Sequence, residues 1–108
     1  MEVAFDSPLL RSICEDQAVA MKELGPVAAE VLKHRLADIR AASTLTDMPA
    51  GHLRVAVEGG GRAIIDLGGG YTIDLEANHR RNPTREGGDI EWGSVSRVKV
   101  MRIGHNND

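Results

Sequence analysis

The chain has 108 residues, with thirteen Lys or Arg, sixteen Asp or Glu, and a formal net charge of −3. This length supports one hydrophobic core, so we expect a single domain over residues 1–108, and the negative charge argues against a protein that binds nucleic acid through phosphate contacts over its whole surface. The single cysteine excludes an internal disulfide, and no apolar run is long enough for a membrane span, which favours a reducing, cytoplasmic setting.

Helical spacing of apolar residues characterises the first part of the chain. A short strand is expected at residues 2–5, and Ser7-Pro8 then supplies an N-cap and a proline suited to the first helical turn. Gly25-Pro26 separates two expected helices, and Glu15-Asp16 allows a break in the first. The residues expected to face inward are Leu10, Ile13, Cys14, Ala18, Met21 and Leu24 in the first helix, and Ala28, Val31, Leu32, Leu36 and Ile39 in the second.

Alternation of apolar and polar residues indicates strands in the second part. We expect a strand at 52–58, then an antiparallel pair at 62–67 and 71–76 that Gly68-Gly69-Gly70 connects. A polar loop follows at 78–89. In the last strand, at 95–103, the apolar positions change phase after Val100, which predicts a β-bulge near Val100-Met101. Helices followed by a sheet predict a small α+β domain.

An ordered set of residues along nearly the whole chain resembles one toxin family. The set comprises Leu24-Gly25, Ala29, Leu32, Arg35-Leu36, Ala41-Ala42, Leu45, Asp66-Leu67, Tyr71, Glu76, Gly87-Gly88-Asp89-Ile90-Glu91-Trp92 and Val95. It is similar to that of HigB-like toxins in the RelE/ParE superfamily, and most closely to the subgroup called plasmid-maintenance killer proteins.

This resemblance implies a fold and a function. The implied fold is an N-terminal two-helix hairpin packed on a curved antiparallel β-sheet. The implied function is the toxin of a type II toxin–antitoxin system, a metal-independent endoribonuclease without a cofactor that inhibits growth by cleaving mRNA, commonly on the ribosome. The implied partner is a helix-turn-helix antitoxin, which could occupy an apolar groove on the helices or a sheet edge.

RNA cleavage by the 2′-hydroxyl requires a base, an acid for the leaving oxygen, and cations near the phosphorane. The candidate catalytic residues are His52, Arg54, Arg62 and Tyr71, and the candidate RNA-binding residues are His79, Arg80, Arg81 and Arg85. Each has a simpler interpretation. His52 fits the wet side of an edge strand, Tyr71 fits a packing aromatic, and the loop arginines fit a solvated loop or contacts with antitoxin carboxylates. Trp92 is expected in the core, and Cys14 is expected to be a buried hydrophobe and not a nucleophile.

Two segments depart from the family pattern. Residues 56–61 read Ala-Val-Glu-Gly-Gly-Gly where relatives carry basic residues, and Tyr71 is followed by Thr72 where relatives carry arginine. Each well-placed donor to the phosphorane contributes about 3 kcal/mol, so losing several could abolish cleavage. The alternative hypothesis is therefore a catalytically inactive or ParE-like protein-binding module of the same fold.

Overall fold

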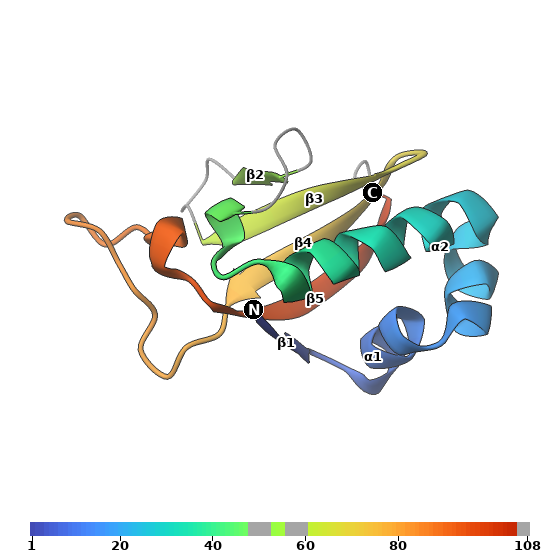
Figure 1. Ribbon diagram of the computed structural model, residues 1–108, viewed down its shortest axis with the longest axis horizontal. Helices are drawn as coiled ribbons and strands as arrows, with labels where there is room; N and C mark the ends of the chain where they lie inside the picture. The colour runs from blue at the N-terminus through green and yellow to red at the C-terminus, as the bar shows by residue number, and fades with distance from the viewer. Residues whose placement is uncertain (48–52, 56–60, 106–108) are drawn as a thin grey trace.

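A computed structural model describes residues 1–47, 53–55 and 61–105, and for 53–55 it describes the backbone alone. The elements follow the order β1 (Glu2–Phe5), α1 (Pro8–Glu15), α2 (Gln17–Ala41), η1 (Leu45–Asp47), β2 (Leu53–Val55), β3 (Arg62–Gly68), β4 (Tyr71–Ala77), η2 (Trp92–Ser94) and β5 (Arg97–His105), where η denotes a short 3₁₀ helix. Helices on one face of a sheet give a two-layer α+β architecture, as the sequence predicted (Figure 1).

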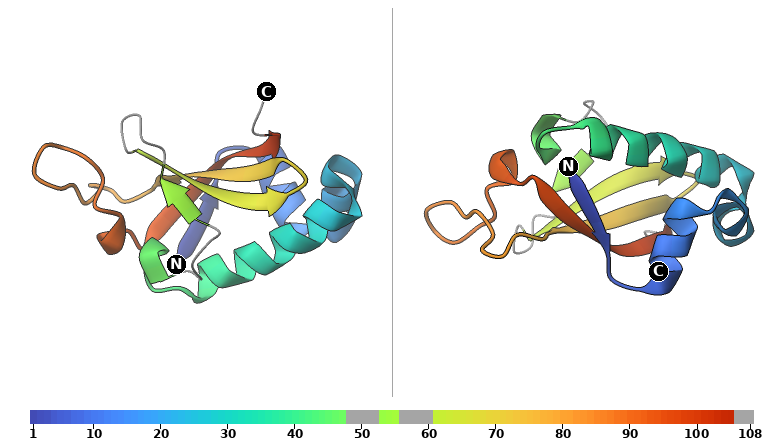
Figure 2. Two further views of the ribbon diagram at one scale, coloured as in Figure 1. Left: turned by 90° about the horizontal axis from the view of Figure 1, so that it is seen from above. Right: turned by 60° about the horizontal axis from the view of Figure 1, so that its bottom comes forward.

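The five strands lie in the order β1-β5-β4-β3-β2. Neighbouring strands run antiparallel except β1, which pairs in parallel with β5. The expectation of a wholly antiparallel sheet was therefore wrong, because the opening strand joins the last strand at the sheet edge. The sheet is mixed, and its twist is visible in Figure 2.

Local capping explains where the helices begin and break. Ser7 Oγ accepts a hydrogen bond from Leu10 N–H at 3.2 Å, and Pro8 occupies the first turn of α1. Asp16 ends α1 and begins α2, with its Oδ1 accepting from Ala18 N–H at 2.9 Å. The break allowed at Glu15-Asp16 is therefore present.

A second break divides α2 at Gly25, where φ is +82° and ψ is 166°. Residues other than glycine rarely adopt these backbone angles. The next residue, Pro26, also disfavours a helical conformation at position 25. The chain thus forms three helical pieces instead of two, and the first expected helix corresponds to α1 and the part of α2 before Gly25. Figure 1 shows that α2 changes direction before it crosses the sheet.

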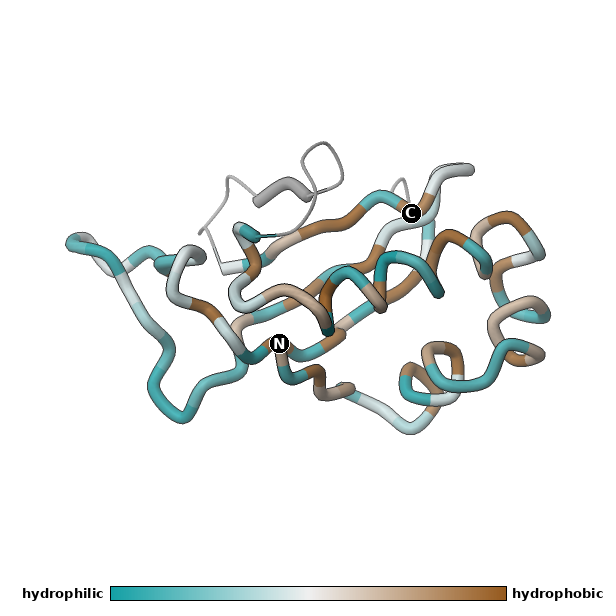
Figure 3. Tube along the Cα trace, viewed as in Figure 1, coloured by the Kyte–Doolittle hydropathy of each residue, from teal (hydrophilic) through white to brown (hydrophobic). Residues whose placement is uncertain are grey.

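The core lies between the helices and one face of the sheet, which we call the inner face. From α2 it receives Ala28, Ala29, Leu32, Leu36 and Ile39, and from the sheet Ala63, Ile65, Leu67, Ile73, Leu75, Val98 and Val100, all buried. Trp92 is 7% exposed, which confirms its expected place in the core. Brown apolar positions on the strands and α2 contrast with the teal loop before β5 in Figure 3.

The bulge expected near Val100-Met101 is present in β5. Asp74 pairs with Arg102 and the next residue, Leu75, pairs with Val100, so Met101 is the extra residue. The bulge lets Val100 and Ile103 both take positions on the inner face although they are an odd number of positions, three, apart in the sequence. A second irregularity leaves Leu67 as the extra residue in β3.

Candidate functional site

The face of the sheet opposite the helices, which we call the outer face, carries mostly polar side chains. Strand alternation and register place on it Arg62, Ile64 and Asp66 of β3, Thr72, Asp74 and Glu76 of β4, and Lys99, Arg102 and Gly104 of β5. No described helix covers this face, because α1 and α2 both lie on the inner side (Figure 2). The outer face is therefore a mainly polar surface to which β3, β4 and β5 all contribute.

Arg62 lies at the centre of the ionic contacts on the outer face. Its Nη2 is 3.2 Å from Glu76 Oε1 and its Nη1 is 3.5 Å from Asp74 Oδ2. Asp74 is only 8% exposed and also accepts a hydrogen bond from Thr72 Oγ1 at 3.4 Å. The two carboxylates balance the guanidinium charge, so Arg62 does not present an unpaired cation to an incoming phosphate.

Tyr71 lies on the other face of the sheet. It pairs in register with His105, and the two rings are 4.0 Å apart between centroids with a tilt of 36°. The half-buried ring of Tyr71 packs against the core. The structure therefore does not bring Tyr71 and Arg62 together, although both were expected to contribute to one site.

The other two candidate catalytic residues are close to β3 in sequence or register. His52 lies outside the described residues. Arg54 lies in β2, where its backbone pairs with Ile64 of β3, and only its backbone is among the described parts of the chain. No side-chain contact of His52 or Arg54 is therefore part of the described structure.

The loop between β4 and β5 holds the four candidate RNA-binding residues, His79, Arg80, Arg81 and Arg85. Three of these are arginines, and all three are exposed. His79 is half-buried, and its Nε2 accepts a hydrogen bond from the backbone N–H of Ser96 at 3.0 Å. His79 therefore has a structural contact with a residue 17 positions away, which sequence patterns do not predict.

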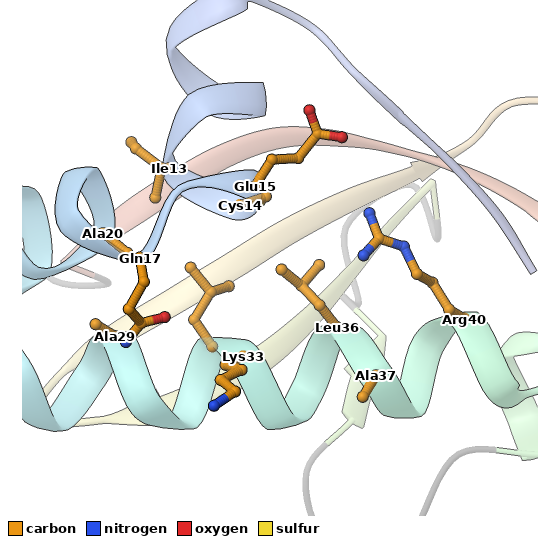
Figure 4. Close-up of a pocket in the computed structure, with 11 residues that line it drawn as sticks. Ile13, Cys14, Glu15, Gln17, Ala20, Ala29, Lys33, Leu36, Ala37 and Arg40 are labelled. Carbon is orange, nitrogen blue, oxygen red and sulfur yellow. The ribbon is translucent and has the colours of Figure 1, made fainter.

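A groove of about 360 Å³ lies between α1 and the second half of α2 (Figure 4). Most of its lining residues are apolar, and Glu15, Lys33 and Arg40 contribute charged groups. Burial raises the pKa of the Cys14 thiol from 9.0 to about 12, with Arg40 opposing the shift and Glu15 adding to it. Cys14 is thus a neutral thiol at physiological pH, which agrees with its expected packing role.

Two further features are absent from the described part of the chain. Within residues 1–47, 53–55 and 61–105, no group of three or more His, Cys, Asp or Glu side chains is arranged to hold a metal ion. None of the helices described there is both long and apolar enough to cross a bilayer.

Thr72, Asp74 and Glu76 were not among the predicted site residues, although the structure gathers them around Arg62. Their alternation with Ile73 and Leu75 was a usable signal, because alternate residues of a strand share a face. Comparisons with the models of known protein families, with curated proteins and with solved structures find no match for this chain.

Proposed function

We propose that this protein is the toxin component of a type II toxin–antitoxin system, that its fold is of the RelE/ParE type, and that a helix-turn-helix antitoxin holds it inactive. The resemblance along nearly the whole sequence supports the proposal. The order of elements agrees with it, since the helices precede β2–β5 and lie on one face of the sheet.

The observation that carries the proposal is the outer face. It combines paired charges with a nearly buried carboxylate, Asp74, and no described helix packs on it. Partly buried polar groups on a sheet face that no described helix covers favour a surface that contacts another macromolecule. We assign the toxic activity to this surface.

The first mode of action is metal-independent cleavage of mRNA. In this mode Arg62 would exchange its carboxylate partners for the phosphate of the RNA and stabilise the charge that develops on the phosphorane. His52 and Arg54 would supply the remaining groups from the segment that leads into and forms β2, next to β3. A base and an acid are both required, and histidine is suited to either role.

The second mode is binding of a protein target without nuclease chemistry. Two observations favour it: Arg62 is neutralised by Asp74 and Glu76, and Tyr71 packs on the inner face. The absence of basic residues from 56–61 acts in the same direction. A charge-balanced face is better suited to a protein partner than to a polyanion.

The test is inducible expression of the lone chain in a bacterium, with growth and mRNA integrity followed together. The variants are His52→Ala, Arg54→Ala and Arg62→Ala, and the matched control is Lys22→Ala, which removes one positive charge from an exposed position on α2. The first mode is supported if the wild type and the control both arrest growth and cleave mRNA, while the three site variants do neither.

Two other outcomes of the same experiment are informative. Growth arrest with intact mRNA supports the second mode, in which the outer face engages a protein. Normal growth at a good soluble yield contradicts the assignment of a toxin altogether.

A further inference from the structure

The segment between β4 and β5, residues 78–91, folds into an ordered projection that we call the arm. Thr84 and Ile90 form an antiparallel bridge, and Glu91 N–H donates to Pro83 O at 2.9 Å. At the tip, Arg85 N–H donates to Asp89 O at 2.7 Å. These contacts join the two sides of the arm, which extends beyond the end of the sheet (Figure 1).

Three arginines of the arm differ from those of the sheet in their ionic contacts. Arg80, Arg81 and Arg85 are exposed, and among the described residues no carboxylate lies within ion-pair distance of them. By contrast, Arg62 and Arg97 each have a carboxylate within 3.2 Å. Unpaired guanidinium groups bind phosphate without first losing a partner, so the arm is better suited to an anion than the outer face is.

The arm also carries carboxylates, and their positions matter. Glu86 and Asp89 are in the same turn as Arg85, and Glu91 lies at the end of the arm, while Arg80 and Arg81 precede Pro83. The positive charge is therefore concentrated in Arg80-Arg81 at the start of the arm.

His79 fixes this start of the arm to the beginning of β5. Its Nε2 accepts the hydrogen bond from Ser96 N–H at 3.0 Å, and its own backbone N–H donates to Asn82 Oδ1 at 2.9 Å. Next to it, Asn78 N–H donates to Arg97 O at 2.8 Å. His79, the residue directly before the arginine pair, is thus held by one hydrogen bond through its side chain and one through its backbone. A neutral imidazole that accepts a hydrogen bond at Nε2 carries its proton on Nδ1.

We propose that Arg80 and Arg81 bind the phosphate backbone of single-stranded RNA and that His79 is the residue that positions them. The choice of RNA rests on the proposed function, whereas the positioning role rests on the hydrogen bonds of His79. The arm holds the strand through charge, and the outer face acts on it. Sequence preference is not part of this contact, because phosphates carry no sequence information.

The experiment measures binding of a fluorescein-labelled oligouridine strand by fluorescence anisotropy over a series of salt concentrations. Losing two phosphate contacts in Arg80→Ala/Arg81→Ala should reduce the slope of log K against log salt by about 1.4 and weaken binding about 20-fold near 0.1 M salt. Lys22→Ala is the matched control for one lost charge outside the arm, and we expect it to bind within about twofold of the wild type.

Two substitutions at position 79 separate positioning from charge. His79→Ala removes the acceptor and should weaken binding about fivefold, while His79→Gln retains an amide oxygen that can accept from Ser96 N–H and should restore most of it. Circular dichroism checks that both variants fold, and a ¹⁵N spectrum of the histidine rings should place the proton of His79 on Nδ1. A proton on Nε2, or equal binding by His79→Ala and the wild type, would overturn the positioning role.

The arm and the proposed toxin function fail separately. Growth arrest by the wild type together with unchanged RNA binding by Arg80→Ala/Arg81→Ala contradicts the arm and leaves the toxin. Arm-dependent RNA binding without growth arrest contradicts the toxin and leaves the arm. If the arginine variant loses binding to a protein target and not to RNA, the partner of the arm is a protein and the proposal is wrong.

Discussion

The place of Tyr71 on the inner face leads to a prediction that separates packing from catalysis. Truncating a fully buried aromatic side chain costs about 3–5 kcal/mol, and a half-buried one should cost about 2 kcal/mol. Contact with the His105 ring, 4.0 Å away between centroids, accounts for about 0.5–1.5 kcal/mol of this. Tyr71→Ala should therefore lower the melting temperature by about 8–16 °C in a domain of this size.

The companion variant, Tyr71→Phe, keeps the ring and removes the hydroxyl. No hydrogen bond of that hydroxyl is found among the described residues, so we expect the free energy of unfolding to change by less than about 0.5 kcal/mol. Urea denaturation followed by circular dichroism measures both variants. A double-mutant cycle with His105→Ala should give a coupling of about 0.5–1.5 kcal/mol between the rings.

Activity decides between the two roles of Tyr71. If the ring serves packing, Tyr71→Phe retains whatever growth arrest the wild type causes. A Tyr71→Phe variant that is as stable as the wild type but has lost growth arrest would refute this reasoning, because only the hydroxyl differs. Unchanged stability of Tyr71→Ala would refute the packing account directly.

Three further predictions concern separate features of the fold. Gly25→Ala should destabilise the protein by about 1–3 kcal/mol, because φ of +82° with ψ of 166° is a conformation that glycine alone tolerates, although no atom lies within 4 Å of the added Cβ. The control is Gly93→Ala, where φ is not positive and the added Cβ would lie 3.3 Å from Oε1 of the flexible Glu91 side chain. Chemical denaturation should show a smaller effect for the control, and equal losses would contradict the backbone explanation. Cys14, with its pKa raised to about 12, should react with iodoacetamide at pH 8 about a thousandfold more slowly than an unperturbed thiol, because the thiolate is the reactive form. Mass spectrometry measures the rate of labelling, and rapid labelling in the folded state would contradict this prediction. Arg62→Ala should lower the free energy of unfolding by about 1 kcal/mol, because it leaves the buried carboxylate of Asp74 without its cation. Glu76→Gln changes an exposed ion pair and should lower it by less than about 0.5 kcal/mol. The reverse order in urea denaturation would contradict the assigned burial.

Local features of the fold were predictable because they depend on near neighbours in the sequence. Ser7-Pro8 specified the start of α1, and the phase change after Val100 specified the bulge at Met101. The parallel pairing of β1 with β5 was not predictable, because the two strands are far apart in sequence and a short edge strand has no pattern that selects its partner.

The candidate site was less predictable than the fold. Alternation within β4 groups Tyr71 with Ile73 and Leu75 on the apolar face, so the strand pattern alone favoured packing, and only the family resemblance placed Tyr71 in a site. The pairing of Arg62 with Glu76 depends on the hairpin register, which the extra residue Leu67 shifts. Such a shift is not visible in composition or periodicity.

The central claim is that the chain is a toxin restrained by a partner. The most direct measurement is growth after induction of the wild-type chain alone and together with the protein that the neighbouring gene encodes, which the proposal expects to contain a helix-turn-helix. The proposal predicts arrest by the lone chain, normal growth when both are expressed, and recovery of the two proteins as one complex. Undisturbed growth with abundant, folded, soluble lone chain would contradict it.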